Sequence, residues 1–505
     1  MKKIIFLLLT LLAACGASAA DFKAGGIYYN INEDGKSVSV TSSDDRNELY
    51  SGNINIPESV EFNSKKYAVT AIGSSAFENC TALTSVTLPS SVTEIRKDAF
   101  YNCASLTSFH IPSSVTELGD AVFEGCTGLT SITIPNSVTK IGRNAFCGCS
   151  SLRYAVLPNS ITAIELGTFN GCHGLTSMYI PDSVTDMQFR SFGYCTSLMS
   201  IKMPPSLSRI GMEAFYCCSS LKSIDLPETL SYIGRDAFYE CTSLTSLTVP
   251  ADTIGAYAFP KCTSLSSLII SPSVNKIGNG AFDGCTQLKS VMLEDSPNPC
   301  EYMYPPFFMG RPEEPYAWPF ETCAIEYLYI GREISSNLFD SIASIKAMSI
   351  GNMVTSIGNW FGDIYNLGYL EISPSVVEIK PGAFLRCTDL STINVHRAEP
   401  PELFKYSFST LTYQRATLHI PKGSKQAYSE APFWKDFLNV ADDLEPASID
   451  NVTADADDGS FDVYDLQGRL LLRSAASGHD WREGLPSGIY LVRSSNGAVR
   501  KEYVR

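Results

Sequence analysis

Sixteen cysteines are the residues of this 505-residue chain with the widest scope for chemistry. In an exported protein, thiols commonly pair as disulfides, and together with histidine they can bind zinc. Side chains that recur at a fixed spacing stack in one column, where neighbouring sulfurs lie alongside one another and a single row gives no tetrahedral closure around a metal. We therefore expect a buried ladder of free thiols and no metal site. Eleven cysteines share one place in a repeat: Cys80, Cys103, Cys126, Cys149, Cys172, Cys195, Cys218, Cys241, Cys262, Cys285 and Cys387.

Two further cysteines, Cys300 and Cys323, flank a stretch rich in proline and aromatic residues, from Tyr302 to Phe320. Two interpretations stay open. Either a disulfide joins the pair and closes this loop, or Cys323 is a displaced member of the ladder.

Catalysis finds little support among the other reactive side chains. The five histidines, which occupy unrelated positions and which we expect on exposed strands or loops, are His110, His173, His396, His419 and His479. None lies in a metal-ligand or nucleophile motif. Cys217 fills a variable site beside the ladder residue Cys218, and the paired carboxylates Glu313 and Glu314 lie in a loop that they solvate. We predict no catalytic residue, no cofactor and no enzymatic activity.

The elements that position these residues follow a repeat of 23 residues. Phenylalanine recurs with this step at Phe77, Phe100, Phe123, Phe146, Phe169, Phe192, Phe215 and Phe238, and a cysteine follows each ring after three residues. Within the unit, apolar residues alternate as in a strand, and a proline such as Pro89 ends that strand at the same place each time. An Ile-Gly pair such as Ile141-Gly142 follows, where we expect glycine to supply the angles of a sharp corner. A fixed period of this length predicts a solenoid of stacked units.

This unit resembles the leucine-rich repeat in its BspA-like, or treponemal, variant. The pattern Leu-x-x-Val/Ile-x-Ile/Leu-Pro with Ile-Gly-x-x-Ala-Phe-x-x-Cys is carried by residues 126–142 and recurs over residues 67–293. Degenerate copies of the repeat occur later, as in Ala383-Phe384-Leu385-Arg386-Cys387, and the array ends near Trp434. The resemblance implies a β-rich leucine-rich repeat solenoid of short strands and turns. It also implies adhesion to host extracellular proteins or to neighbouring cells.

The amino terminus reads as an export signal. Lys2 and Lys3 precede an apolar run, Ile4 to Leu12, that is too short to span a bilayer. Two processing routes compete: Ala17-Ser18-Ala19 fits an ordinary signal peptidase, which we favour, while Leu12-Ala13-Ala14-Cys15 resembles a lipobox that would anchor the protein by a lipid on Cys15. The formal net charge of −15 suits solubility outside the cell and disfavours nucleic acid as a partner.

The carboxyl terminus loses the repeat and predicts a separate module. Strands are indicated at 461–465, 469–472 and 488–492, with turns at Gly468 and Asn496-Gly497. These segments resemble the C-terminal sorting domain of type IX secretion in Bacteroidetes, which implies a small β-sandwich that contacts the export machinery. A module of that kind favours a non-lipidated signal over Cys15. The expected division is therefore a signal peptide at 1–20, an N-terminal β cap at 21–66, regular repeats at 67–293, a Pro/aromatic-rich interruption at 294–324, degenerate repeats with a C-terminal cap at 325–440, a linker at 441–448 and a sorting domain at 449–505.

The repeat register also predicts which side chains face outward. On the first strand of each unit these are the residues on either side of the middle apolar position, and most are small and polar. Tyr154, Val156 and Tyr179 are exceptions from adjacent units and predict an exposed aromatic patch. Cross-strand packing that merely protects the sheet is the other interpretation, and we place it slightly ahead. The aromatic interruption around Tyr302 and Trp318 either covers the array or presents a contact surface.

These observations predict a cell-surface or secreted protein that binds other proteins through exposed solenoid faces. Two other interpretations stay open: a structural spacer without a specific ligand, and a non-catalytic scaffold in a glycan-handling surface assembly. The uniform Ser/Thr faces fit the spacer, whereas the tyrosines favour binding. The oligomeric state does not follow from the pattern.

Overall fold

The computed structural model describes residues 20–43, 49–303, 317–335, 338–339, 342–360 and 364–444, and the backbone of four strands between residues 460 and 504. The predictions for Cys15, the signal peptide, His479 and Glu313-Glu314 concern residues outside the described ones. The chain divides into two compact units. Unit 1 comprises Met1–Leu207 with Gly211–Ser219, and unit 2 comprises Ser208–Ile210 with Ser220–Arg505.

A small sheet begins unit 1 and closes the end of its core. Its strands are β1 (Phe22–Ala24), β2 (Ile27–Ile31), β3 (Ser37–Thr41), β5 (Ser59–Phe62) and β6 (Lys65–Ile72). The first three pair antiparallel, and β3 then pairs in parallel with β6. Phe22 stacks on Phe62 with ring centroids 4.3 Å apart, so the apolar face is covered. β4 (Gly52–Asn55) already pairs in parallel with the first strand of the repeats, so stacking begins before residue 67.

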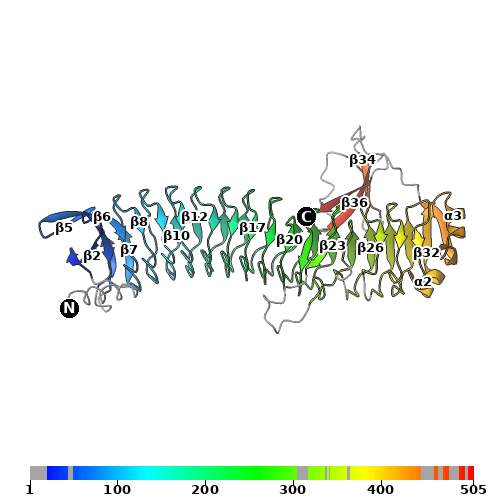
Figure 1. Ribbon diagram of the computed structural model, residues 1–505, viewed down its shortest axis with the longest axis horizontal. Coiled ribbons are helices and arrows are strands. Elements are labelled where there is room, and N and C mark those ends of the chain that lie inside the picture. Colours follow the sequence, from blue (N-terminus) through cyan, green and yellow to red (C-terminus); the bar gives the residue numbers. More distant parts are fainter. Residues whose placement is uncertain are drawn as a thin grey trace, which may run out of the picture. The chain divides into compact units, whose positions relative to one another are not determined.

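Most coils of unit 1 contribute two short parallel strands, as the ribbon in Figure 1 shows for the blue to green part of the chain. In the coil that contains Phe109, the first strand is reduced to a single bridge, Ser108↔Ser131. The first strands are β7 (Leu83–Thr87), β10 (Ser131–Thr133), β12 (Tyr154–Val156), β14 (Ser177–Tyr179) and β16 (Ser200–Lys202). The second strands are β8 (Glu94–Ile95), β9 (Glu117–Leu118), β11 (Lys140–Ile141), β13 (Ala163–Ile164) and β15 (Asp186–Met187). Registers such as Ile132↔Ala155 and Glu94↔Glu117 place equivalent residues side by side. The predicted solenoid of 23-residue repeats is confirmed.

A column of phenylalanines runs through the core of unit 1. From Phe77 to Phe215, successive rings lie 5.0–5.6 Å apart with planes within 12° of parallel. Every ring of this column is fully buried. Offset stacking of this kind adds to the free energy gained by burying each ring. The predicted alignment of equivalent side chains is therefore confirmed.

The cysteine ladder lies beside this column, as predicted. The thiol of Cys103 donates to the carbonyl of Phe77 at 3.1 Å, and the same contact recurs along the ladder to Cys218. The described cysteines are free thiols. Burial raises the pKa of Cys80 to about 11 and raises the pKa of Cys195 well above its ordinary value. A thiol held protonated in this way packs as a small apolar side chain and reacts slowly.

The corners of the coils differ from the prediction. Gly142 and its equivalents do not have positive φ values; instead, a Cβ on Gly142 would lie 2.4 Å from the backbone of the preceding coil. Close packing of coil on coil, rather than backbone angle, explains these glycines. The left-handed positions are two others in each coil, occupied for instance by Asp98 and Asn102 at φ 56° and 60°. Cys217, at φ 58°, occupies the second of these positions.

Unit 2 has the same plan with less regular coils. Its first strands form one nine-stranded sheet of β19 (Ser246–Val249), β21 (Ser267–Ile270), β23 (Ser290–Leu293), β25 (Tyr327–Ile330), β26 (Ala347–Ile350), β28 (Tyr369–Ile372), β30 (Thr392–Val395), β32 (Thr417–Pro421) and β33 (Asn439–Leu444). Its second strands are β17 (Arg209–Ile210), β18 (Tyr232–Ile233), β20 (Thr253–Ile254), β22 (Lys276–Gly278), β24 (Glu301–Met303), β27 (Ser356–Ile357), β29 (Glu378–Ile379) and β31 (Glu402–Leu403). β33 extends to Leu444, so part of the segment expected to be a linker, 441–448, is a strand.

The aromatic and thiol columns continue through the interruption of the repeat. Phe320 stacks between Phe282 and Phe339 at 5.0 and 4.9 Å. The thiol of Cys323 donates to the carbonyl of Phe282 at 3.3 Å, which is the ladder contact. Of the two interpretations of Cys323, the displaced ladder position is therefore confirmed. Cys300 is buried elsewhere, in a β-bridge with Ile334.

One buried cation holds the less regular coils of unit 2 together. Arg332 is fully buried, and its guanidinium donates to five backbone carbonyls. Its shortest contacts are 2.7 Å, from Nη1 to Val274 and from Nη2 to Ser271. Desolvation lowers the pKa of Arg332. The planar guanidinium thus supplies donors to the carbonyls of Val274 and Glu294 and adds to the bonds that other carbonyls already accept.

Short helices close the carboxyl end of the array. α2 (Thr410–Arg415) is capped by Ser409, and α3 (Lys425–Glu430) and a 3₁₀ turn, η2 (Trp434–Asp436), follow. Trp434 is buried, and its indole donates to the carbonyl of Pro401 at 2.6 Å. Beyond residue 459, the described strands are β34 (Ser460–Tyr464), β35 (Leu470–Ala476), β36 (Gly488–Ser494) and β37 (Val499–Val504), which form one antiparallel sheet. The predicted β-sandwich stays a prediction.

Candidate functional site

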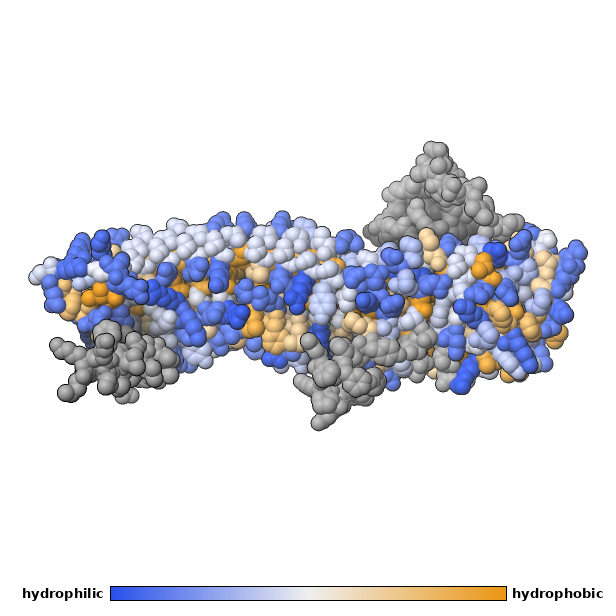
Figure 2. Space-filling model, viewed as in Figure 1, coloured by the Kyte–Doolittle hydropathy of each residue, from blue (hydrophilic) through white to orange (hydrophobic). Residues whose placement is uncertain are grey.

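The first strands of unit 1 present alternate side chains to solvent. In β10, β14 and β16 the middle residue is buried and the residues on either side are exposed. This alternation follows from the twofold period of a strand whose one face packs on the core. Figure 2 shows hydrophilic and intermediate residues over most of the visible face, with hydrophobic residues in small separate areas. The outer row of unit 1 is thus mainly small and polar.

Tyr154 and Tyr179 interrupt that polar row. Tyr154 is 58% exposed and Tyr179 is 51% exposed, whereas Val156 is half-buried between neighbouring strands. Lys202 lies directly opposite Tyr179 in the parallel pair of β14 and β16, and its Nζ sits 5.3 Å from the centroid of the tyrosine ring. The hydroxyl of Tyr179 also donates to Asp182 at 3.5 Å. We call Tyr154, Val156, Tyr179 and Lys202 the tyrosine patch.

The tyrosine patch combines three properties that favour protein contacts. Tyrosine offers a large apolar area with few rotatable bonds, and its hydroxyl hydrogen-bonds at the edge of a contact. The ammonium group of Lys202 lies over the ring of Tyr179 and keeps its charge exposed. The geometry therefore suits a binding surface and supplies no group positioned for proton transfer or nucleophilic attack.

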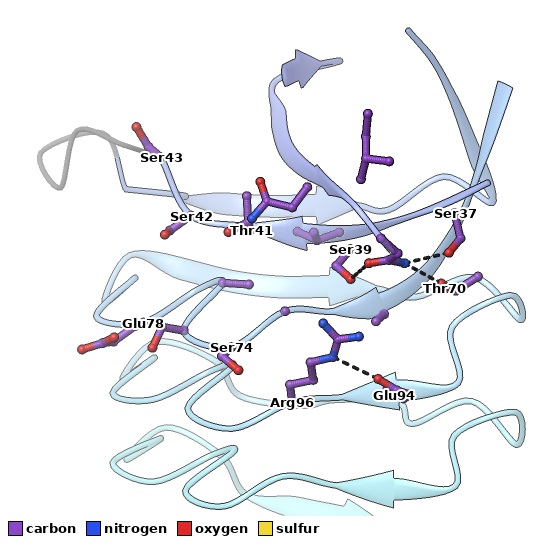
Figure 3. Close-up of a pocket in the computed structure, with 18 of the residues that line it drawn as sticks. Ser37, Ser39, Thr41, Ser42, Ser43, Thr70, Ser74, Glu78, Glu94 and Arg96 are labelled. Carbon is purple, nitrogen blue, oxygen red and sulfur yellow. Dashed lines mark hydrogen bonds and ion pairs between the residues drawn. The ribbon is translucent and has the colours of Figure 1, made fainter. Parts of the chain in front are cut away.

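A second candidate is a cleft beside the N-terminal cap, with a volume of about 1120 Å³. Figure 3 shows Ser39, Thr41 and Thr70 on one side of this cap cleft and Ser74 and Arg96 on the other. Hydroxyl and amide groups dominate its lining. Strand β3 supplies three of them because its residues alternate, with Val38 and Val40 in the core and Ser37, Ser39 and Thr41 toward the cleft.

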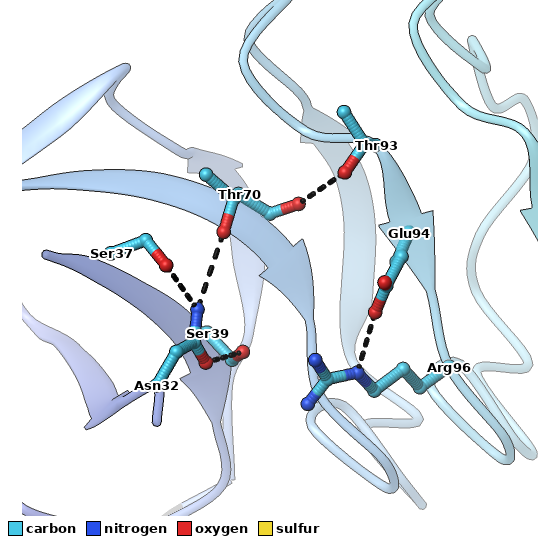
Figure 4. A network of polar contacts seen from close by, with 7 residues as sticks. All are labelled: Asn32, Ser37, Ser39, Thr70, Thr93, Glu94 and Arg96. Atoms are coloured by element: carbon cyan, nitrogen blue, oxygen red, sulfur yellow. Dashed lines mark hydrogen bonds and ion pairs between the residues drawn. The ribbon is translucent and has the colours of Figure 1, made fainter. Parts of the chain in front are cut away.

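Asn32 organises the polar side of the cap cleft (Figure 4). Its amide nitrogen donates to Ser37 at 2.7 Å and to Thr70 at 3.2 Å, while its amide oxygen accepts from Ser39 at 2.6 Å. Across the cleft, Arg96 donates to Glu94 at 2.9 Å. Fully paired polar groups of this kind hold a surface in one shape.

The charges of the cap cleft suit hydrogen bonding rather than catalysis. Backbone amides of Lys36 and Ser37 lower the pKa of Asp34, so this carboxylate is ionised and engaged. Cys80, also in the lining, stays protonated because burial raises the pKa of its thiol to about 11. Sequence reasoning missed the cap cleft, although the alternation Ser-Val-Ser-Val-Thr at 37–41 was a signal that could have found it.

The histidines are only partly as predicted. His110 and His173 are exposed, but His396 and His419 are half-buried on the outer face of unit 2. His396 contacts Glu371 at 2.7 Å, and His419 contacts Asp443 at 2.9 Å. Adjacent first strands bring each histidine beside a carboxylate that is distant in sequence, and for that reason the pattern of the chain did not reveal the pairs.

The aromatic residues of the interruption fall partly within the described chain. Tyr302 is buried, donates to Asn279 at 2.9 Å and meets Trp318 edge to face at 5.3 Å. These two residues therefore pack on the array, while residues 304–316 lie outside the described residues.

Two properties of the described residues bear on ion and membrane binding. No group of three or more histidine, cysteine, aspartate or glutamate side chains in that part of the chain is placed to hold a metal ion. None of its helices has the length and hydropathy to cross a bilayer.

Comparisons with known proteins agree with this architecture. A family model described as BspA type leucine rich repeat region matches in six copies, over residues 53–176, 162–289 and 318–434. The crystal structure of a leucine-rich repeat protein from Bacteroides ovatus is 25% identical, covers 80% of this chain and 100% of its own, and superposes with a TM-score of 0.52. A leucine rich cell surface protein from Faecalibacterium prausnitzii is 27% identical over 75% of this chain and 95% of its own, with a TM-score of 0.42. No curated protein matched the chain.

Proposed function

Because the chain belongs to the BspA-type leucine-rich repeat family, we propose that it is an exported protein, attached to the cell surface or released, that binds other proteins through the outer face of unit 1. Leucine-rich repeat proteins in general bind proteins. The proposed partners are host extracellular or cell-surface proteins, or the surfaces of other cells. The tyrosine patch is the observation that carries this proposal, because two half-exposed tyrosines stand on a row that carries mainly small polar side chains.

The tyrosine patch is tested by a double variant, Tyr154→Ser with Tyr179→Ser. Both side chains are on the surface, so their loss leaves the core intact. The wild-type chain is immobilised and exposed to extracellular-matrix proteins and to host-cell membrane extracts, and retained proteins are identified. We expect the double variant to lose at least about tenfold in affinity for the retained partner, since aromatic hot spots contribute 2 kcal/mol or more.

A matched control is Tyr406→Ser, which removes a tyrosine of similar exposure, 57%, from unit 2. This variant should bind like the wild type. Equal binding by the double variant and the wild type would discard the patch. A wild-type chain that retains no protein from either source would instead favour the structural spacer.

The export route is the second part of the proposal. We propose that residues 1–20 are a cleaved signal peptide and that residues 449–505 are a sorting domain that contacts a type IX secretion machinery, as in Bacteroidetes. Cell fractionation with amino-terminal sequencing tests this. A mature chain that begins near Ala20 in the surface or medium fraction agrees with the proposal, whereas a lipid-modified amino terminus at Cys15 replaces it with a lipoprotein anchor.

The cap cleft favours a second candidate function, in which the chain holds a polar ligand such as a glycan within a surface assembly. The hydroxyl, amide and carboxylate groups of its lining are the kinds of group that exchange hydrogen bonds with the hydroxyls of a sugar. Arg96, which is half-exposed at the edge of the cleft, is the residue to change. Binding on a glycan array that is lost in Arg96→Ala and kept in the double tyrosine variant would support this function.

A further inference from the structure

The outer face of unit 2 carries an apolar row where unit 1 carries a polar one. Ile269, Met292 and Tyr329 lie side by side on β21, β23 and β25, in parallel register. They occupy the outward positions, since the residues before them in each strand, Leu268, Val291 and Leu328, are core residues. Even so, Ile269, Met292 and Tyr329 are only 8%, 6% and 2% exposed, and they form a buried apolar cluster with Tyr327 packed against it.

The burial of this row exceeds what the strands themselves provide. Ser267 on β21 is 3% exposed, whereas Ser131, Ser177 and Ser200, at the equivalent place in unit 1, are exposed. Part of the cover of Tyr329 comes from the array itself, since its hydroxyl donates to Asp295 at 2.6 Å and lies against Gly351. The hydroxyl of Ser290 on β23 is also buried without a hydrogen-bond partner in the described residues. An element lying above the outer face of the nine-stranded sheet would account for the burial of Ser267, Ser290 and Met292.

The end of the array supplies an occupant within reach. The ordered array finishes in β33, the last strand of this same sheet, and the strands of the carboxyl-terminal module begin at Ser460. Residues 445–459 between them can extend to about 50 Å at 3.3 to 3.6 Å per residue. Six strand spacings separate β33 from β23, or roughly 29 Å. The connection is therefore long enough to lay the module over Met292.

Composition favours the same occupant. Residues 460–505 contain seven Lys and Arg against five Asp and Glu, an excess of basic residues in a chain whose net charge is −15. Glu371 and Asp443 lie on the outer face of the sheet beyond the apolar row. The strand β36 has four consecutive apolar residues, Ile489-Tyr490-Leu491-Val492, a pattern typical of strands that are covered on both faces. A four-stranded antiparallel sheet of this size also gains its stability by packing on another element.

We propose that the outer face of β21, β23 and β25 is an intramolecular docking site, occupied in the full chain by the carboxyl-terminal module, residues 460–504. Docking buries Ile269, Met292, Tyr327 and Tyr329, and release of the module uncovers them as an apolar surface. This inference does not depend on the proposed function of the tyrosine patch, which lies in unit 1.

Methionine oxidation tests the proposal in the full chain, because peroxide converts an accessible thioether to the sulfoxide and spares a covered one. Unit 2 contains its own standards: Met353 is 50% exposed, and Met348 is a core residue at 1%. We expect Met292 to oxidise at the slow rate of Met348, as followed by peptide mass spectrometry. Oxidation of Met292 at the rate of Met353 in the intact chain would overturn the proposal, because the face would then be open.

A protease site placed within residues 445–459 of the full chain identifies the cover. After folding and purification, the chain is cut and the carboxyl-terminal piece is separated by size exclusion. We expect Met292 to lose its protection and reach the rate of Met353, while Met348 stays slow and shows that the array remains folded. Unchanged protection of Met292 after the piece has left would show that the module is not the cover, and would end the proposal.

A cut piece that stays bound is examined through two variants of the full chain. Ile269→Asp places a charge in the docking site, and Thr133→Asp makes the same change on the equivalent row of unit 1. Release of the piece from Ile269→Asp and its retention by Thr133→Asp support docking at this face. Retention of the piece by both variants counts against it.

Discussion

Unit 1 and unit 2 use the same coil in two different ways. In unit 1 the repeat is strict, the columns of phenylalanine and cysteine run without a gap, and the outer row is mostly small, polar and exposed, with the tyrosine patch as the exception. In unit 2 the repeat is worn, a buried arginine replaces regular contacts, and the outer row carries large side chains that are mostly covered. A regular core thus accompanies an outer row that stays exposed, whereas a less regular core accompanies an outer row that is covered.

The thiol ladder is common to both units, so alkaline pH should affect both. Burial raises the pKa of Cys80, in unit 1, from 9.0 to about 11 and that of Cys387, in unit 2, to about 12. A raised pKa in the folded state means that the unfolded chain loses protons first, so stability is complete below pH 9 and falls as the pH rises from 9 toward 11 and 12. In that window, each thiol should lower the free energy of unfolding by about 1 kcal/mol for each pH unit.

Urea unfolding at pH 8 and at pH 10.5 measures this effect. Far-UV circular dichroism follows the whole chain, while tryptophan fluorescence follows unit 2, because all four tryptophans come after residue 219. Both transitions should move to lower urea at pH 10.5. A transition that keeps its midpoint would show that the ladder of that unit is not a buried thiol column.

Phe146→Ala should lower the stability of unit 1 and leave that of unit 2 unchanged. The ring of Phe146 stacks between Phe123 and Phe169 at 5.6 Å on each side. Its loss leaves a cavity and should lower the free energy of unfolding by about 3 to 5 kcal/mol. We expect the circular dichroism transition to shift or split while the tryptophan transition stays in place. Phe146→Leu, the matched control, should have a smaller effect. Equal shifts in both signals would mean that the units unfold as one.

Arg332→Met is the counterpart in unit 2. Removal of the guanidinium takes one donor from each of five backbone carbonyls, and even partial rescue by water should lower the free energy of unfolding by roughly 3 kcal/mol. Here we expect the tryptophan transition to move. Arg332→Lys, which keeps the charge but not the planar donors, should recover only part of the stability. Full stability in Arg332→Met would remove the special role given to this residue.

Ala121→Gly should have the smallest effect and the opposite sign. Ala121 has φ 52°, a left-handed conformation that disfavours a residue with a Cβ, so glycine should stabilise unit 1 by about 1 kcal/mol. Ala99→Gly, in the neighbouring coil but at a position without positive φ, should destabilise by a similar amount. Thermal unfolding of the two variants compares them directly, and a loss of stability in Ala121→Gly would contradict the assignment of the corner.

Much of the core followed from the repeat. The positions of Phe100, Cys103 and Pro89 were predictable, because a periodic chain places equivalent residues in equivalent surroundings. The outward position of Tyr154 and Tyr179 followed from the same register. The second strand of each coil, the left-handed corners and the close approach at Gly142 did not, because they depend on how one coil rests on the next.

Local pattern alone determined that this chain is a stack of leucine-rich coils, with one aromatic and one thiol column inside and small polar residues outside. Tertiary structure alone decided which distant residues meet: Asn32 with Thr70 in the cap cleft, Glu371 with His396, and Arg332 with the turn at Val274. The physical reason is that burial and strand alternation are recorded along the chain, whereas a contact between coils depends on side chains that no single repeat contains.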